Sequence, residues 1–136
     1  MNVDIIVGTR PNFMKVAPII RAIEELPTEN RKLSYRLIHT SQHYDFNMSK
    51  SFFEQLGIPA PHNNFNISGG SITQQTANIM LEYEKLLKSK VSDLCLVVGD
   101  VTSTMACAIT AKRFNVRIAH VEGGIRSGDL SMPEEI

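Results

Sequence analysis

Polar side chains that could hold or transform a charged ligand stand directly behind apolar runs of the sequence. The first run, VDIIV, ends at Gly8-Thr9-Arg10, and Lys15 follows one helical turn later. An arginine fork beside a helix N-terminus suits a phosphate, because the guanidinium offers paired donors and the helix start offers free N–H groups. The alternative is a solvated arginine beside a structural glycine turn, and the residues leave these two interpretations equally open.

Carboxylates stand behind two later apolar runs, at Asp100 and Glu122. Asp100 precedes the hydroxyls of residues 102–104 and, taken alone, is better explained as a helix cap. Packing explains Glu122 poorly, and this residue suits acid/base chemistry with a pKa tuned by partial burial; the alternative is a loop ion pair with Arg126. Glu134 is a further acid/base candidate, or an acidic residue that begins a helix.

The elements that must position these residues follow from the apolar periodicity. We expect strands over residues 3–8, 34–40, 64–67, 93–98 and 116–121, and helices over 12–26, 46–56, 71–90 and 102–114. Pro18 predicts a kink or a late regular start in the first helix. Strands alternating with helices predict the α/β class, a Rossmann-like doubly wound parallel sheet in a single domain. Ligands bind beyond the carboxyl ends of such strands, so the candidate residues should meet at one edge.

Composition excludes several classes of function. The 136 residues suit one domain, and 14 basic residues balance 14 acidic ones, so we expect neither general nucleic-acid binding nor membrane binding. The two cysteines, Cys95 and Cys107, form no CxxC pair, which favours buried thiols and a cytoplasmic protein. The histidines lack metal-ligand spacing, so we expect no metal. The first turn lacks the GxGxxG pattern and carries an arginine, which argues against a dinucleotide-binding oxidoreductase domain.

Motifs spread over nearly the whole chain carry a family resemblance. GTRPNFMKVAP, SQHYD, VVGDVTST and HVEGGIRSGDLSMPEEI, in this order, resemble the N-terminal part of a non-hydrolysing UDP-N-acetylglucosamine 2-epimerase. The resemblance implies a glycosyltransferase-B-like fold of two Rossmann-like domains, a homodimer and no cofactor. It also implies interconversion of UDP-GlcNAc and UDP-ManNAc, by elimination of UDP and its re-addition with the opposite configuration at carbon 2.

The resemblance assigns roles to the residues that match its motifs. Arg10 and Lys15 match the basic residues near the substrate phosphates. Asp100, Glu122 and Glu134 match the catalytic carboxylates, without a division of the steps between them. The resemblance thus implies that Arg10 binds the diphosphate of UDP, which leaves the sugar and is added back during the reaction.

A second segment and two departures bear on regulation. Gln42 and His43 match a segment that contributes to a regulatory UDP-GlcNAc site in bacterial members. Asn12 stands where the family commonly has glutamate, and Asp45 stands where members with that site tend to have a second glutamine. The second departure puts allosteric activation by the substrate in doubt.

The resemblance also implies that residues 1–136 are a truncated N-terminal domain without the C-terminal nucleotide-binding domain. We therefore expect this chain by itself to be inactive and its full-length parent to be the epimerase. Three alternatives remain. A hydrolysing 2-epimerase would release free ManNAc and UDP, a related glycosyltransferase would use another nucleotide sugar, and a non-catalytic α/β module would only bind a ligand or partner.

Overall fold

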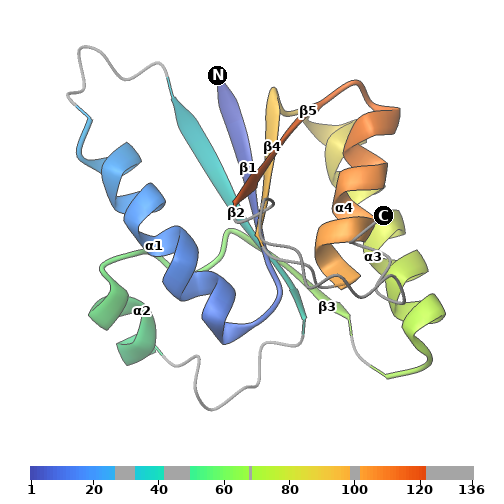
Figure 1. Ribbon diagram of the computed structural model, residues 1–136, viewed down its shortest axis with the longest axis horizontal. Helices are drawn as coiled ribbons and strands as arrows, with labels where there is room; N and C mark the ends of the chain where they lie inside the picture. Colours follow the sequence, from blue (N-terminus) through green and yellow to red (C-terminus); the bar gives the residue numbers. More distant parts are fainter. Residues whose placement is uncertain (27–32, 42–49, 68, 99–101, 122–136) are drawn as a thin grey trace, which may run out of the picture.

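The computed structural model places a parallel β-sheet between two layers of helices (Figure 1). It describes residues 1–26, 33–41, 50–67, 69–98 and 102–121. The elements, in chain order, are β1 (Asn2–Val7), α1 (Arg10–Glu24), β2 (Ser34–Ser41), α2 (Lys50–Leu56), β3 (Asn63–Ile67), α3 (Ile72–Ser89), β4 (Leu94–Val98), α4 (Thr102–Arg113) and β5 (Arg117–Val121). The expected α/β class and Rossmann-like sheet are confirmed.

The five strands lie in the order β3-β2-β1-β4-β5, and every pair is parallel. Helices α1 and α2 cover one face, and α3 and α4 cover the other (Figure 1). The chain therefore builds outward from β1 to β3, then crosses back and continues from β4 to β5. This reversal lies between β1 and β4, and in such sheets the diverging loops at the carboxyl ends of the strands there form the ligand crevice.

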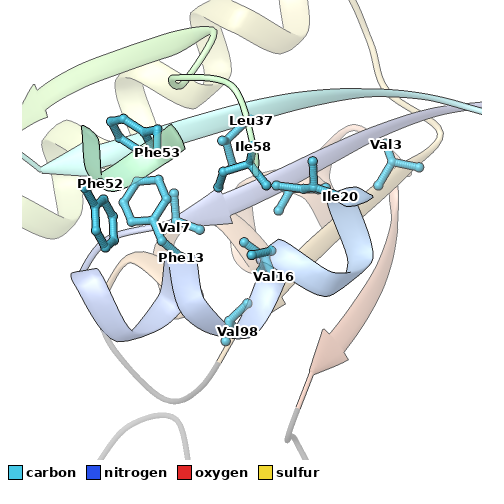
Figure 2. Packing of buried hydrophobic residues seen from close by; sticks show 12 residues of the cluster. Val3, Val7, Phe13, Val16, Ile20, Leu37, Phe52, Phe53, Ile58 and Val98 are labelled. Carbon is cyan, nitrogen blue, oxygen red and sulfur yellow. The ribbon is translucent and has the colours of Figure 1, made fainter. Parts of the chain in front are cut away.

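Aromatic side chains of α1 and α2 pack together on the first face. The ring centroid of Phe13 lies 5.4 Å from that of Phe53 and 6.1 Å from that of Phe52 (Figure 2). Leu37 of β2 and Val98 of β4 belong to the same buried cluster. This packing anchors the first turns of α1, which begins at Arg10, against the sheet.

A buried ion pair crosses the second face, between neighbouring strands. Asp4 of β1 is fully buried and stands opposite Arg36 of β2 in the strand register. Arg36 donates from Nε to Asp4 Oδ1 at 2.7 Å and from Nη2 to Oδ2 at 2.9 Å. Tyr83 of α3 donates its hydroxyl to Asp4 Oδ2 at 2.8 Å. The pair therefore ties two strands to the helix above them.

Helix boundaries follow local signals. α1 begins at Arg10, so the expected late start near Pro18 is wrong; Pro18 is exposed, and water can reach the carbonyl that the proline leaves without an N–H partner. α2 ends before Gly57, which has a φ of 71°. Ser71 caps α3, as expected, by accepting from Gln74 N at 3.1 Å. None of the helices in the described part of the chain has the length and apolar character to cross a bilayer.

Candidate functional site

A small pocket lies beyond the carboxyl ends of β1, β2 and β3, where α3 and α4 begin. Its volume is about 190 Å³. Its lining residues are Gly8, Thr9, Thr40, Ile67, Gln75, Ile79, Thr102 and Ser103. Hydroxyl and amide groups dominate its polar lining, and no charged side chain of the described residues takes part. The pocket is therefore suited to neutral polar groups such as sugar hydroxyls or an amide.

Gly8 allows the turn after β1 to approach α4 closely. A Cβ atom on Gly8 would lie 2.7 Å from Ser103 Oγ and 3.1 Å from Thr40 Oγ1. A Cβ cannot occupy the first position unless the serine side chain shifts. Glycine is required here by space, because its φ is not among the positive values. The absence of this side chain brings β1, β2 and α4 together around the pocket.

The hydroxyls that follow Asp100 in the sequence have separate tasks at the start of α4. Thr104 is buried and donates its hydroxyl to the carbonyl of Val98, at 2.7 Å, which ties the helix back to the end of β4. Ser103 is buried and faces Gly8, while Thr102 is partly exposed at the pocket rim. Of the hydroxyls expected near a ligand, Thr102 and Ser103 line the pocket, and Thr104 has a structural role.

The turn between β1 and α1 is closed by the side chain of Asn12. Its Oδ1 accepts from Gly8 N at 3.0 Å and from Thr9 N at 3.2 Å. The N–H groups of Asn12 and Phe13 point to the carbonyl of Thr9, and Pro11 has no N–H. The expectation that this helix start offers free N–H groups to a phosphate is therefore wrong for these residues, because local acceptors already use their donors.

The predicted site residues fall into two groups. Arg10 is the first residue of α1, beside the pocket residues Gly8 and Thr9, although its side chain lies outside the described part of the chain. Lys15 is exposed on α1 and does not line the pocket. The other predicted residues, which are Gln42, His43, Asp100, Glu122 and Glu134, lie outside the described residues.

Sequence reasoning missed several residues of this edge. Thr40 is the next-to-last residue of β2, Gln75 lies in the first turn of α3, and both line the pocket. A signal for Thr40 was present, since it is the last residue of the strand expected over residues 34–40. Gln75 gave no such signal, because only the packing of α3 against the sheet brings it to this edge. Within the described residues, no group of three acidic, cysteine or histidine side chains could hold a metal.

The two thiols are inert in this fold. Cys95 and Cys107 are both free and buried. Burial raises the pKa of the Cys95 thiol to about 12, and burial also raises the pKa of Cys107 well above its ordinary value. The reactive form of a cysteine is the thiolate, so these residues are packing residues and take no part in chemistry at neutral pH.

Comparison with known proteins finds similarity along the whole chain. The family model for UDP-N-acetylglucosamine 2-epimerase matches residues 25–136. The chain is 43% identical over 136 residues to the UDP-N-acetylglucosamine 2-epimerase of Methanocaldococcus jannaschii, and 43% identical to the UDP-2,3-diacetamido-2,3-dideoxy-D-glucuronate 2-epimerase of Pseudomonas aeruginosa. These alignments cover 100% of this chain, but only 36% and 37% of the respective relatives.

The structural comparison agrees with the sequence comparison. The crystal structure of the Methanocaldococcus jannaschii UDP-GlcNAc 2-epimerase in complex with UDP-GlcNAc and UDP superimposes with a TM-score of 0.87 and 43% identity. The match covers 99% of this chain and 36% of that structure. Likeness at this level of identity, along nearly the entire chain, goes beyond a shared Rossmann-like sheet. The chain belongs to the UDP-N-acetylglucosamine 2-epimerase family.

Proposed function

We propose that the full-length protein is a non-hydrolysing UDP-N-acetylglucosamine 2-epimerase, and that this chain is the N-terminal domain of its two-domain, glycosyltransferase-B-like fold. The observation that carries the proposal is the similarity along the whole chain to an enzyme that was crystallised with UDP-GlcNAc and UDP. The chain spans about a third of the length of such relatives. The active site would then lie between this edge of the sheet and the part of the protein that the relatives have in addition.

In the proposed reaction, the protein removes the proton at carbon 2 and UDP leaves from carbon 1. The resulting glycal-like intermediate accepts a proton on the opposite face, and UDP returns to carbon 1. Asp100, Glu122 and Glu134 are the carboxylates available for these proton transfers. Arg10 and Lys15 would hold the diphosphate in its bound and departed states. The reaction changes no oxidation state overall and consumes no cofactor.

The small pocket supports a role in binding the sugar. Its lining supplies Thr40, Gln75, Thr102 and Ser103, whose hydroxyl and amide groups can bond to sugar hydroxyls or to an acetamido group. Arg10 begins α1 next to this lining. If the diphosphate of a nucleotide sugar lies near Arg10, its uncharged sugar would therefore reach the pocket.

A second candidate substrate is favoured by one comparison. The relative from Pseudomonas aeruginosa, a 2-epimerase of UDP-2,3-diacetamido-2,3-dideoxy-D-glucuronate, is as similar to this chain as the relative from Methanocaldococcus jannaschii. The two substrates differ at carbons 3 and 6 of the sugar, while the reaction at carbon 2 is the same. The reaction type is therefore supported by both relatives, and the choice of sugar requires a direct test.

The test offers each UDP-sugar separately to the full-length protein and identifies the products by NMR. UDP-ManNAc from UDP-GlcNAc, formed faster than any product from the diacetamido-glucuronate, would support the proposal. Faster epimerisation of the diacetamido-glucuronate would show that this sugar is the preferred substrate and that the proposed reaction type is correct. Free ManNAc with UDP would establish the hydrolysing alternative instead. No binding of UDP and no product from either sugar would favour the non-catalytic module.

The proposal includes a homodimer, a cytoplasmic location and a second UDP-GlcNAc site at Gln42 and His43. Exposed Leu81 of α3 lines a largely apolar groove of about 270 Å³ between α3 and α4, a surface suited to a second copy. Sedimentation would test the dimer: Leu81→Lys should yield monomers, whereas Val91→Lys, at another exposed apolar position, should not.

The cytoplasmic location is supported by two free, buried thiols, which accord with a reducing compartment.

A further inference from the structure

Of the two buried hydroxyls that stand side by side at the start of α4, only one has a hydrogen-bond partner among the described residues. Thr104 donates its hydroxyl to the carbonyl of Val98 at 2.7 Å. The hydroxyl of Ser103 makes no such bond within this part of the chain, although Ser103 is only 6% exposed. A polar group buried without a partner costs stability, so its presence needs an explanation. Because Ser103 lines the small pocket, a ligand there would supply the missing bond.

The carboxamide of Gln75 lies at the same pocket with its donor end already held. Gln75 is half-buried, and its Nε2 donates to the carbonyl of Gly69 at 3.3 Å. Ser71 and Gln74 fix the start of α3 beside it, since Ser71 N donates to Gln74 Oε1 at 2.8 Å and Gln74 N donates to Ser71 Oγ at 3.1 Å. The bond to Gly69 leaves Gln75 Oε1 as an acceptor, and none of the described residues donates to it.

The polar groups of the pocket thus form an uncharged set in which acceptors prevail. The hydroxyl of Thr40 donates to the carbonyl of Val7 at 3.5 Å, which leaves its oxygen to accept. Sugar hydroxyls and the N–H of an acetamido group are donors that match such acceptors. An ionised carboxylate can only accept, and removing it from water without a cation beside it is unfavourable. The lining therefore favours an uncharged ligand that carries donors.

The size of the pocket limits what enters it. Sites for complete drug-sized ligands measure about 300–1,000 Å³. This pocket measures about 190 Å³, which suits one sugar ring and leaves the nucleotide outside.

We infer that Gln75 and Ser103 are specificity-determining residues: both bond to the sugar of the substrate, and together they select an uncharged sugar over a uronate. Gln75 Oε1 accepts from a sugar hydroxyl or from the acetamido N–H, and the Ser103 hydroxyl gains the partner that the described residues do not give it. The inference rests on the proposed function, which puts a nucleotide sugar at this edge. It adds which of the two candidate sugars the pocket takes.

Two variants of the full-length protein remove the contacts one at a time. Ser103→Ala and Gln75→Met should each lower kcat/KM for UDP-GlcNAc about three- to tenfold, as expected for one lost hydrogen bond. The Kd for UDP, measured by calorimetry, should stay unchanged because UDP has no sugar to place in the pocket. The thermal midpoint of Ser103→Ala should stay or rise, since the substitution removes a buried hydroxyl without a partner.

Matched controls repeat the same substitutions at exposed positions away from the pocket. Ser89→Ala, at the end of α3, and Gln55→Met, on α2 across the sheet, should change neither kcat/KM nor the Kd for UDP. Unchanged kcat/KM in both pocket variants would overturn the inference, and so would a rise in the Kd for UDP as large as the loss in kcat/KM. A lowered midpoint in Ser103→Ala would also overturn it, because the hydroxyl would then have a structural role.

Gln75→Lys tests the selectivity against charge. The wild type should use UDP-GlcNAc about tenfold more efficiently than the diacetamido-glucuronate, because the carboxylate meets no cation in the pocket. Gln75→Lys places a cation there and should bring the two kcat/KM values closer than Gln75→Met does, most of all at low salt. Equal ratios in these two variants, or a wild type that prefers the uronate, would overturn the selectivity.

The proposed function fails by a different result, which is a wild type that makes no UDP-ManNAc. If that protein still binds UDP-GlcNAc, its Kd replaces kcat/KM in the same comparison with UDP, and Gln75 and Ser103 are tested as before. A wild type that binds neither UDP nor UDP-GlcNAc would overturn both the proposed function and this inference.

Discussion

Arg36 and Asp4 face each other across two neighbouring strands, and a forked pair of hydrogen bonds joins their side chains beneath α3. The side chain of Asp4 is 1% exposed and that of Arg36 is 17% exposed. Arg36 also donates to Ser92 Oγ at 3.1 Å and to the carbonyl of Lys90 at 3.2 Å. One arginine thus connects β1, β2 and the segment that leads from α3 into β4.

The first prediction concerns this pair. Arg36→Met keeps much of the side-chain bulk but leaves the carboxylate of Asp4 buried without its cation. Breaking a buried ion pair in this way costs about 3–5 kcal/mol, so the free energy of unfolding should fall by roughly that amount. Urea denaturation monitored by circular dichroism measures the change.

Arg36→Lys provides the matched control for the same position. Lysine keeps the positive charge but cannot form the forked pair of bonds, so it should recover part of the loss. If Arg36→Met instead left the unfolding midpoint within experimental scatter, the ion pair would contribute nothing net, and β1 and β2 would be held by backbone bonds and apolar packing alone.

The second prediction concerns alkaline pH. The pKa of Cys95 is raised by burial from an ordinary value of 9.0 to about 12. Between these values the unfolded chain has lost the proton that the folded chain still holds. The stabilising contribution is therefore complete below pH 9 and is lost as pH rises toward 12. Each such thiol should lower the free energy of unfolding by at most about 1.4 kcal/mol per pH unit in this window.

Denaturation series from pH 7.5 to 10.5, under reducing conditions, test this linkage. Cys95→Ala removes one titrating group, so its stability should decline less steeply above pH 9 than that of the wild type. Adding Cys107→Ala should flatten the curve further, because burial raises the pKa of that thiol too. Parallel curves for wild type and both variants would show that other groups govern the alkaline loss.

The third prediction concerns the close approach at Gly8. Gly8→Ala places a methyl group 2.7 Å from Ser103 Oγ, so the turn or α4 must move. Overpacking of this kind costs about 1–3 kcal/mol and should reduce turnover by the full-length protein, since the same residues line the pocket.

A second substitution distinguishes this clash from a general defect. Ser103→Ala in the Gly8→Ala background removes the oxygen that the new methyl meets, and the Ser103 Cβ lies at an ordinary 3.5 Å. Part of the lost stability should return, and a double-mutant cycle measures the coupling. Additive effects of the two substitutions would mean that the clash is absorbed elsewhere, for instance at Thr40.

Local patterns were sufficient to predict most of the fold. Short apolar runs that end in glycine marked β1 and β4, and the spacing of apolar residues marked α1 and α3 to within a few residues. Ser71 and Gly57 were correct as boundary signals for α3 and α2. The expected late start at Pro18 was wrong. Packing of the buried face of α1 stabilises the helix by more than the exposed proline destabilises it.

Contacts that join distant residues could not be predicted. Asp4 interrupts an apolar run, and nothing in its neighbours indicates that the strand register places Arg36 opposite or that Tyr83 lies above. Asn12 was visible as a departure from the family pattern, but its two bonds to the turn emerge only from the backbone geometry. Among the proposed site residues, Asp100, Glu122 and Glu134 lie outside the described residues and remain predictions.

The most direct test of the central claim is exchange at carbon 2 of the sugar. Full-length wild type and Glu122→Gln are incubated with UDP-GlcNAc in deuterated water, and NMR follows carbon 2 and the products. A reversible 2-epimerase predicts UDP-ManNAc and deuterium at carbon 2 in the wild type, with both strongly reduced in the variant. Wild-type conversion to UDP-ManNAc with the original proton retained at carbon 2, or release of free ManNAc and UDP, would contradict the account.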